Sequence, residues 1–204
     1  MIEKNISFDD AGRNSLKVGI DTLSQAVAST LGASGKTVII EDQFGNPHIT
    51  KDGVTVANSV ILSDPVENLG VSILRQASQK TATEAGDGTT TSCVLAKAII
   101  DRCFDAIDSI ENVTQAKEGI EVAAKNVVLA LEKMKKEVTD KSLVEVATIS
   151  ANGDKYLGEM IADAYLQVGK NGVVTMDESP TNDDYTEITN GTRINRGYGS
   201  PFSI

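Results

Sequence analysis

The sequence predicts a mainly helical fold with small β-sheet elements, an α+β class. Apolar residues recur at helical spacing over several long segments, while one short segment has the pattern of strand, turn and strand. The composition agrees, since 17 of 204 residues are glycine, none is tryptophan and 4% are aromatic, which is typical of helix-rich rather than all-β proteins. An apolar fraction of 40% is sufficient for one sizeable core, with or without a small second domain.

The first predicted helix has a single apolar stripe and ends at Gly32. Its stripe consists of Leu16, Ile20, Leu23, Val27 and Leu31. The next segment, residues 36–50 (KTVIIEDQFGNPHIT), predicts a hairpin whose bend lies at residues 44–47. A second tight turn at residues 51–53 precedes VTVANSV, so Asp52 is expected in a turn between two strands.

Three more helices are predicted before residue 135. The first starts at Asp64, a suitable N-cap, followed by Pro65 and by Glu67 in a box-like arrangement. The loop GDGTTT (86–91) ends that helix and opens the next, and Thr114 starts the third. The faces expected to point inward are Val66, Leu69, Ile73 and Ala77; then Val94, Ala98 and Ile107; then Ile120, Ala123, Val127, Ala130 and Met134.

A charged stretch at residues 132–142 (EKMKKEVTDKS) indicates a domain boundary. Beyond it we expect a short helical segment ending in ISANGD (149–154) and a helix through residues 157–168. Residues 169–172 (GKNG) stop that helix, and residues 173–176 (VVTM) have the pattern of a strand. The tail from residue 183 alternates in the manner of β-structure.

Charge and composition exclude several classes of function. A net charge of -10 argues against nucleic acid or an anionic membrane as the main partner, because both require basic surfaces. The sequence has no apolar run of membrane-spanning length and no signal-peptide core near its start, which predicts a cytoplasmic protein. Cys93 and Cys103 would lie roughly 15 Å apart along one helix, too far for a disulfide. A single histidine, His48, cannot form a metal cluster alone.

One apparent phosphate-binding motif fails on its spacing. Gly35-Lys36-Thr37 resembles the end of a Walker A motif, but the first glycine of that motif would fall at position 30, which is threonine. The expected order of elements is also reversed, because a P-loop joins a strand to a helix and this segment joins a helix to a strand. A P-loop kinase or ATPase is therefore not predicted.

The loop GDGTTT fits a phosphate site better. Gly86 and Gly88 permit a sharp bend, and the threonines 89–91 would present amide groups and hydroxyls where a helix start favours anions. Asp87 would repel a phosphate unless it also bound Mg²⁺. Asp52 is a second carboxylate that could orient a water molecule toward the γ-phosphate, or it could be an ordinary turn aspartate. The pattern predicts a nucleoside triphosphate site.

Five segments resemble a known family when taken in order. They are TLGASGKTVIIEDQFGNPHITKDGVTVA, AGDGTTTSCVLA, TISANGD, VGKNGVVTMDE and NRGYGSPF, and they resemble the first part of a group I chaperonin of the bacterial GroEL type. The resemblance runs from about Asn5 to the last residue. It implies an ATP-dependent chaperone and ATPase whose subunits form a homo-oligomeric, heptameric ring and fold unfolded client polypeptides, with a lid co-chaperonin as a candidate partner.

The resemblance also divides the chain. Residues 1–133 match the first half of the equatorial ATPase domain, a helical bundle with a β-hairpin. Residues 134–190 match the first half of the intermediate domain, and residues 191–204 match the start of the apical domain.

Residue by residue, the resemblance implies contacts for ATP, Mg²⁺ and K⁺, while the family's clamp on the base and ribose and a further acidic residue near the γ-phosphate come from the part of the family's length beyond this sequence. The segment against the nucleotide matches Thr30, Leu31, Gly32 and Ala33. The backbones of Thr30 and Lys51 match a K⁺ site, Asp87 matches the Mg²⁺ ligand, and Asp52 matches the carboxylate that assists hydrolysis. The phosphate loop matches Gly86, Gly88, Thr89, Thr90 and Thr91. Tyr198 and Phe202 match apical positions that bind clients.

The sequence also departs from the family. Ala33 and Ser34 replace a usual proline and basic residue, and Asn58 stands where arginine is frequent. Family members are more than twice as long, so these residues are expected to be part of a longer polypeptide or a truncated one. The alternative function is a half-chaperonin that docks into rings through the N-terminal strand and the 37–50 hairpin without hydrolysing ATP.

Overall fold

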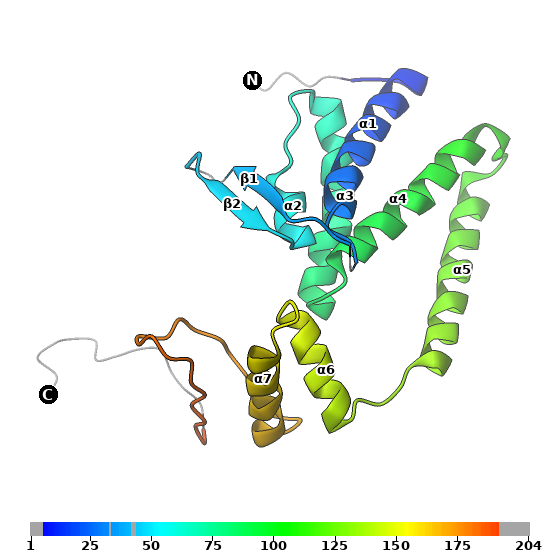
Figure 1. Cartoon of the computed structure of the whole chain (residues 1–204). Helices are drawn as coiled ribbons and strands as arrows, with labels where there is room; N and C mark the ends of the chain where they lie inside the picture. The colour runs from blue at the N-terminus through cyan, green and yellow to red at the C-terminus, as the bar shows by residue number, and fades with distance from the viewer. Residues whose placement is uncertain (1–5, 33, 42–43, 192–204) are drawn as a thin grey trace, which may run out of the picture. The chain divides into compact units, whose positions relative to one another are not determined.

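The structure, a computed structural model, describes residues 6–32, 34–41 and 44–191. It contains α1 (Asp9–Ala28), β1 (Val38–Glu41), β2 (Pro47–Thr50), α2 (Gly53–Ser59), α3 (Pro65–Ala85), α4 (Thr89–Ala106), a short 3-10 helix (Ile107–Ser109), α5 (Val113–Met134), α6 (Asp140–Ser150) and α7 (Lys155–Val168) (Figure 1). The mainly helical class with a small sheet is confirmed. The chain divides into two compact units, Met1–Gly119 and Ile120–Ile204, which we describe separately.

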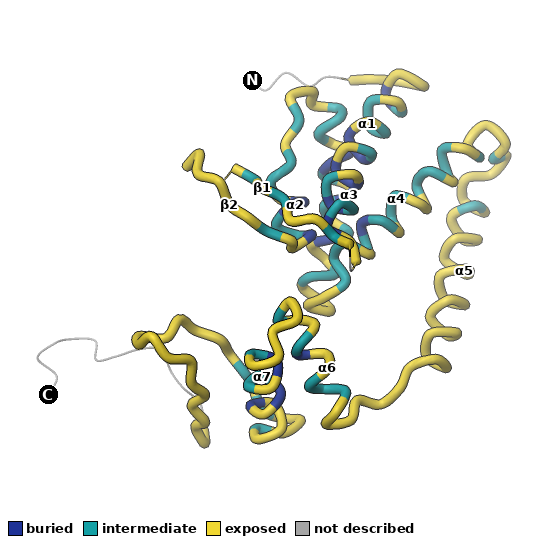
Figure 2. Tube along the Cα trace, viewed as in Figure 1, coloured by how far each residue is buried: buried dark blue, intermediate teal, exposed yellow. Residues whose placement is uncertain are grey.

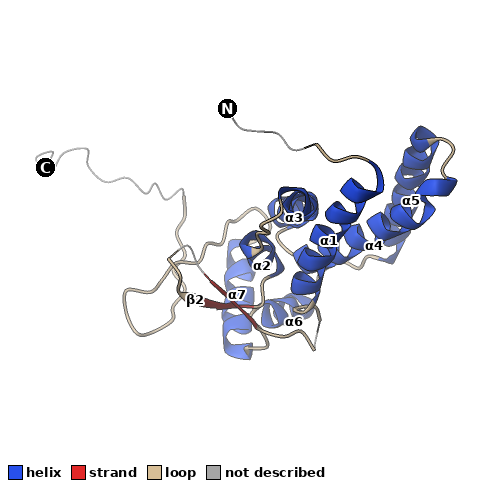
Figure 3. Cartoon of the chain, turned by 90° about the horizontal axis from the view of Figure 1, so that it is seen from above, coloured by secondary structure: helices blue, strands red, loops and turns tan. Residues whose placement is uncertain are grey.

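The core of the first unit lies among its first four helices. Helices α1, α3 and α4 pack against one another and α2 contacts all three, an arrangement that is visible from above in Figure 3. The buried side chains come from every one of these helices: Ile20, Leu23, Val27, Val56, Ala57, Val71, Leu74 and Cys93. Figure 2 shows the buried positions along the facing sides of α1 and α3. The apolar stripe predicted for the first helix is therefore buried at its centre.

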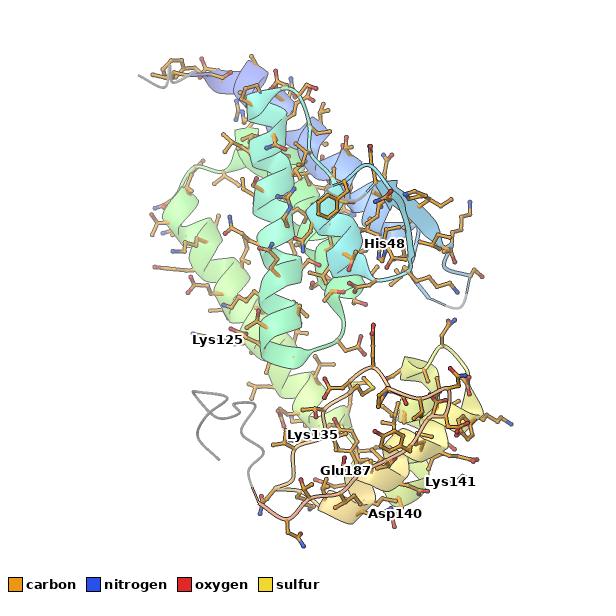
Figure 4. The ribbon with its side chains drawn as sticks, turned by 90° about the vertical axis from the view of Figure 1, so that its left-hand side faces the viewer. His48, Lys125, Lys135, Asp140, Lys141 and Glu187 are labelled. Atoms are coloured by element: carbon orange, nitrogen blue, oxygen red, sulfur yellow. The ribbon has the colours of Figure 1, made fainter. Side chains whose placement is uncertain are left out.

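The predicted hairpin is confirmed. Strands β1 and β2 are antiparallel, and their register pairs Val38 with Thr50 and Glu41 with Pro47. His48 lies on β2 and is exposed (Figure 4). The hairpin places the end of β2 directly before residues 51–53, so the turn that carries Asp52 joins β2 to α2.

The segment VTVANSV is helical, and the prediction of a strand there was wrong. Asp52 is the N-cap of α2, because its carboxylate accepts hydrogen bonds from the amides of Val54 and Thr55. A capped first turn outweighs the weak preference of β-branched residues for strands. Asp52 thus stands between a strand and a helix rather than between two strands.

The inward face predicted for α3 is also wrong. Leu69 and Ile73 are 58% and 49% exposed, whereas the buried positions are Gly70, Val71, Leu74 and Ser78. A side chain at Gly70 would collide with the carbonyl oxygen of Leu16 on α1. The two helices cross with their backbones close together, and small residues that carry little hydrophobic signal therefore occupy the contact.

Helix α5 contrasts with the bundle. None of its residues is buried, and the positions predicted to face inward, such as Ile120, Val127 and Met134, are exposed. Figure 2 shows the helix exposed along almost its whole length, and Lys125 projects from it in Figure 4.

The second unit is built on α6 and α7, which pack against each other. Thr139 and Ser142 form a capping box at the start of α6, and Asp154 caps α7 through the amide of Leu157. Figure 4 marks Asp140 and Lys141 at the start of α6. Residues 173–176 do not form the predicted strand, and residues 183–191 contain none either. Tyr198 and Phe202 lie outside the described residues.

Among the helices that the structure describes, none is long and apolar enough to cross a membrane.

Candidate functional site

Three short segments of the first unit meet around one cleft of about 300 Å³. One segment follows α1, one lies between β2 and α2, and one joins α3 to α4. The residues lining the cleft are Thr30, Leu31, Gly32, Lys51, Asp52, Gly53, Asp87, Gly88, Thr89, Thr90 and Thr91. Segments far apart in the sequence are thereby brought to one place.

The residues predicted for the nucleotide and its ions that the structure describes line this cleft, with one exception. Gly86 is the left-handed C-cap of α3 with φ 76°, and it shapes the bend without lining the cleft. Ala33 lies outside the described residues. Gly53 lines the cleft and was missed, although the Asp-Gly pair at 52–53 repeats the pair at 87–88. That repetition is the signal that could have identified it.

Helix α4 starts without a side-chain cap. Its N-cap is Gly88, which has a left-handed backbone with φ 82° and no side chain that could accept from the first turn. The first amide groups of a helix have no partner within it, and the helix dipole adds partial positive charge there. The amides of Thr89–Thr91 therefore form a surface of the cleft that favours an anion.

Gly53 brings the start of α2 against the start of α4. A Cβ built on Gly53 would overlap Thr90 Oγ1 and lie 3.1 Å from the Thr90 amide nitrogen. On the other side, the hydroxyls of Thr30 and Thr90 lie 3.5 Å apart, and Thr30 Oγ1 donates to the Val27 carbonyl at 2.8 Å. Thr90 is thus enclosed between α1 and α2, which fixes the geometry of the first turn of α4.

The Asp52 carboxylate is held firmly by the start of its own helix. Oδ1 accepts from the Val54 amide at 3.3 Å, and Oδ2 accepts from the amide and hydroxyl of Thr55 at 2.9 and 2.5 Å. The Asp52 amide donates to Thr50 Oγ1 at 3.0 Å. Because each carboxylate oxygen has two acceptor positions, Oδ1 keeps capacity for one more donor, such as a water molecule.

Asp87 supplies the second carboxylate of the cleft. It is exposed, and its Oδ1 accepts from the Gly88 amide at 2.6 Å. No group of three or more histidine, cysteine or acidic residues within the described ranges could hold a metal. A metal ion bound by Asp87 would need oxygen ligands from outside the protein, and Mg²⁺ is usually held by one or two carboxylates together with phosphate oxygens and water. The residues present fit that cation.

Two serine hydroxyls form hydrogen bonds with the first turn of α4. Ser78 and Ser92 both donate to the carbonyl oxygen of Thr89, at 3.3 and 2.8 Å.

Cys93 is free and buried, and burial raises its pKa to about 11. A thiol with so high a pKa is a poor nucleophile, so Cys93 belongs to the core. Cys103 is also free, as the spacing predicted.

Comparison with known proteins matches almost the whole chain. A model of the TCP-1/cpn60 chaperonin family matches residues 23–203. Mitochondrial heat shock protein 60 of Saccharomyces cerevisiae is 45% identical over 98% of this chain and 35% of the relative. Mitochondrial heat shock protein 60 of Ajellomyces capsulatus is 45% identical over 98% of this chain and 34% of the relative. The chain therefore spans about a third of the length of these curated relatives.

Solved structures agree on the fold. The chaperonin gp146 of bacteriophage EL 2 (Pseudomonas aeruginosa), crystallised in the presence of ATP-BeFx, matches 78% of this chain and 28% of its own with a TM-score of 0.67 and 30% identity. A group III chaperonin in the open state matches 76% of this chain and 31% of its own with a TM-score of 0.62 and 26% identity.

The comparisons correct one prediction from the sequence. A cytoplasmic location was expected, whereas both curated relatives are mitochondrial proteins. The expectation rested on missing signals alone, and missing signals do not identify a compartment.

Proposed function

The chain belongs to the TCP-1/cpn60 chaperonin family, and from that premise we propose that its first unit forms the ATP-binding and ATP-hydrolysing half-site of a chaperonin subunit. The observation that carries the proposal is the cleft in which the uncapped start of α4 faces two carboxylates, Asp52 and Asp87. That combination suits a triphosphate with its metal ion. The related phage chaperonin was crystallised with ATP-BeFx, which supports the choice of nucleotide.

The threonines of the first turn of α4 hold the phosphates in this proposal. Thr89, Thr90 and Thr91 each offer a backbone amide and a hydroxyl at the positive end of an 18-residue helix. Gly88 has no side chain to compete for those amides. The segment from Thr30 to Gly32 lines the same cleft, and in this proposal the rest of the nucleotide would lie against it.

In this proposal Asp87 would hold Mg²⁺, and the backbones of Thr30 and Lys51 would hold K⁺. The divalent ion would supply positive charge that offsets the negative charge of the phosphate groups. The chain contributes a carboxylate whose position is fixed by its bond with the Gly88 amide. The Lys51 side chain adds a positive charge to a cleft that otherwise carries two carboxylates.

Asp52 orients the water molecule that attacks the γ-phosphate. Its carboxylate is fixed by three donors from α2, and Oδ1 retains an acceptor position. A water molecule held by an immobile carboxylate loses little freedom on reaching the transition state, which is the main way an enzyme accelerates this reaction.

At the level of the whole protein we propose a ring-forming chaperone, heptameric as group I chaperonins are, that folds client polypeptides with a lid co-chaperonin as a partner. In this proposal residues 1–133 are the first half of the equatorial domain and residues 134–190 the first half of the intermediate domain. Residues 191–204 begin the apical domain, and Tyr198 and Phe202 contact clients there.

The test is hydrolysis of ATP by the protein with and without Asp52→Asn. Asparagine caps a helix as well as aspartate does, so the variant keeps the fold of α2 while losing the negative charge. We expect hydrolysis to fall on the order of 100-fold. Asp64→Asn is the matched control, because Asp64 caps α3 in the same way outside the cleft. Equal hydrolysis by Asp52→Asn and the parent would contradict the role of Asp52.

The second candidate function is a module that docks to its partners without hydrolysing ATP. The same measurement of ATP hydrolysis distinguishes it from the first. Its support is the exposed hairpin, on which Ile39 and Ile49 are paired across the strands and are 70% and 66% exposed. A parent protein that binds ATP without measurable hydrolysis would favour this candidate.

A further inference from the structure

We propose that Arg75 on α3 is a positioning residue that sets the place of the Asp52 carboxylate by holding the opposite end of α2. The inference rests on the proposed function, since it concerns the residue assigned to the hydrolytic step. Arg75 does not line the cleft, so its effect would be transmitted through α2 alone.

The contacts of Arg75 join two helices. Its Nε donates to the Ala57 carbonyl at 2.9 Å, and its Nη2 donates to the Val60 carbonyl at 2.5 Å. Ala57 is in the last turn of α2, and Val60 is its C-cap. Carbonyl groups at the end of a helix have no partner within it, and a cation is favoured there by the dipole. A single half-buried guanidinium therefore completes the C-terminal end of α2.

A weaker contact lies beside the first. Gln79, one turn farther along α3, donates from Nε2 to Asn58 Oδ1 at 2.8 Å. Gln79 and Asn58 are both exposed, so this bond competes with water and contributes less than the two bonds of Arg75. Together, two residues of α3 four positions apart hold the last turn of α2.

A shift of one end of α2 moves the other end, because the helix is short. It has seven residues and is therefore about 10 Å long. Asp52 is fixed to the first turn by three hydrogen bonds, so the carboxylate moves with the helix. At that end Gly53 lies directly against Thr90, and the Asp52 side chain accepts its hydrogen bonds from Val54 and Thr55 of its own helix. The two guanidinium bonds are thus the stronger of the two polar connections described between α2 and α3.

The expected consequence is a loss of turnover with little loss of affinity. Thr89–Thr91 form the first turn of α4 and Asp87 lies in the turn before it, whereas the hydrogen bonds of Arg75 go to Ala57 and Val60. A displacement of about 1 Å in a catalytic group can lower a rate on the order of 100-fold. We expect Arg75→Met to slow ATP turnover at saturating ATP about 10-fold while changing the dissociation constant of ATP less than about 3-fold.

The first experiment measures hydrogen exchange in α2 and does not depend on activity. In Arg75→Met the amides of α2 should exchange faster, with those of α1 unchanged, and Arg75→Lys should lie between that variant and the parent. Lys80→Met is the matched control, because Lys80 is an exposed residue of α3 whose ion pair is with Glu84 on the same helix. Unchanged protection of α2 in Arg75→Met would overturn the proposal.

The second experiment asks whether Arg75 acts through Asp52. Arg75→Met should slow turnover in the parent and have little further effect in the Asp52→Asn background, because residues that act as a unit are not additive. Equal losses in both backgrounds, or a loss of affinity alone, would overturn the proposal. A parent that does not hydrolyse ATP contradicts the proposed function instead, and the exchange result then still decides whether Arg75 anchors α2.

Discussion

Two long helices of the same bundle begin in opposite ways. Helix α3 starts at Asp64, whose carboxylate accepts from the amides of Val66 and Glu67 at 2.8 and 3.0 Å, and its first helical residue is proline. Helix α4 starts at Gly88, which offers no side-chain acceptor. Both helices pack on α1, so the difference lies in their ends rather than in their packing.

At the start of α3 the protein itself satisfies the first amides of the helix, whereas at the start of α4 those amides are left for a ligand. In α3 the protein supplies its own anion and removes one unpaired amide by using proline. In α4 the corresponding amides open into the cleft between Thr30, Asp52 and Asp87. The capped helix contributes stability to the fold, and the uncapped helix is available for function. The first substitutions either give one helix start the chemistry of the other or test the two starts separately, and the last one concerns the body of α4.

The largest effect is expected from giving α4 the cap that α3 has. Gly88→Asp places a carboxylate where the phosphates would lie, and repulsion at a distance of a few ångströms should lower ATP affinity on the order of 100-fold. The measurement is a calorimetric titration with ATP and Mg²⁺.

Gly88→Ala is the control for that experiment. It carries the backbone strain of a left-handed residue, about 1 kcal/mol, without the charge. If Gly88→Asp bound ATP as tightly as Gly88→Ala, the assignment of the α4 start as the phosphate site would be wrong.

The next effect tests whether the contribution of Asp87 to ATP affinity depends on Mg²⁺. Asp87→Asn should lower ATP affinity about 10-fold when Mg²⁺ is present and raise it when Mg²⁺ is absent, because the Asp87 carboxylate then only repels the phosphates. Asp64→Asn should behave like the parent under both conditions. An equal loss with and without Mg²⁺ would show that Asp87 does not act through the ion.

A smaller effect is expected from removing the cap of α3. Asp64→Ala should lower the free energy of unfolding by about 1 kcal/mol, measured by urea denaturation, and leave ATP affinity unchanged. Asp52→Ala should cost a similar amount of stability because Asp52 is also a cap, and it should additionally abolish hydrolysis. A decrease in ATP affinity in Asp64→Ala would contradict the separation of the two starts.

The smallest effect concerns the body of α4 rather than its start. Lys97 lies 3.0 Å from Asp21 of α1 and bonds to Asp101 of α4, and these contacts raise the pKa of Lys97 above its ordinary value of 10.5. A raised pKa means that the stabilisation is fully present below about pH 10.5 and is lost as the pH rises through the folded-state value.

Lys97→Met should therefore lower the free energy of unfolding by less than about 1 kcal/mol at pH 7, since the charges are partly exposed. The difference from the parent should disappear in strongly alkaline solution. Urea denaturation of both proteins at pH 7, 9 and 11 measures this difference in the free energy of unfolding. A difference that grows with pH would contradict the assignment of the stabilisation to the charged lysine.

The starts of these helices were predictable because caps are local. Asp64 with Pro65, the loop at residues 86–91 and the hairpin all depend on residues close in sequence, and each was found where the pattern placed it. The helix at Gly53–Ser59 was not predicted, since its β-branched residues favour a strand and only the hydrogen bonds of the Asp52 side chain show that the segment is helical.

Contacts between distant segments were harder to predict. The buried face of α3 includes Gly70 and Ser78, which carry no hydrophobic signal, so periodicity selected Leu69 and Ile73 instead. Gly53 was missed for a related reason, because its importance lies in its approach to Thr90, thirty-seven positions later. A residue whose role is to be small gives no hydrophobic signal, and for Gly53 the repeated Asp-Gly pair was the remaining indication in the sequence.

The most direct test of the central claim is a map of backbone amide chemical shifts on adding ATP and Mg²⁺. We predict that the amides of Thr89, Thr90 and Thr91 show large changes while those of Val66 and Glu67, at the capped start of α3, do not move. Unchanged amides at the start of α4, in a protein that binds ATP, would contradict the assignment of that helix start as the phosphate site.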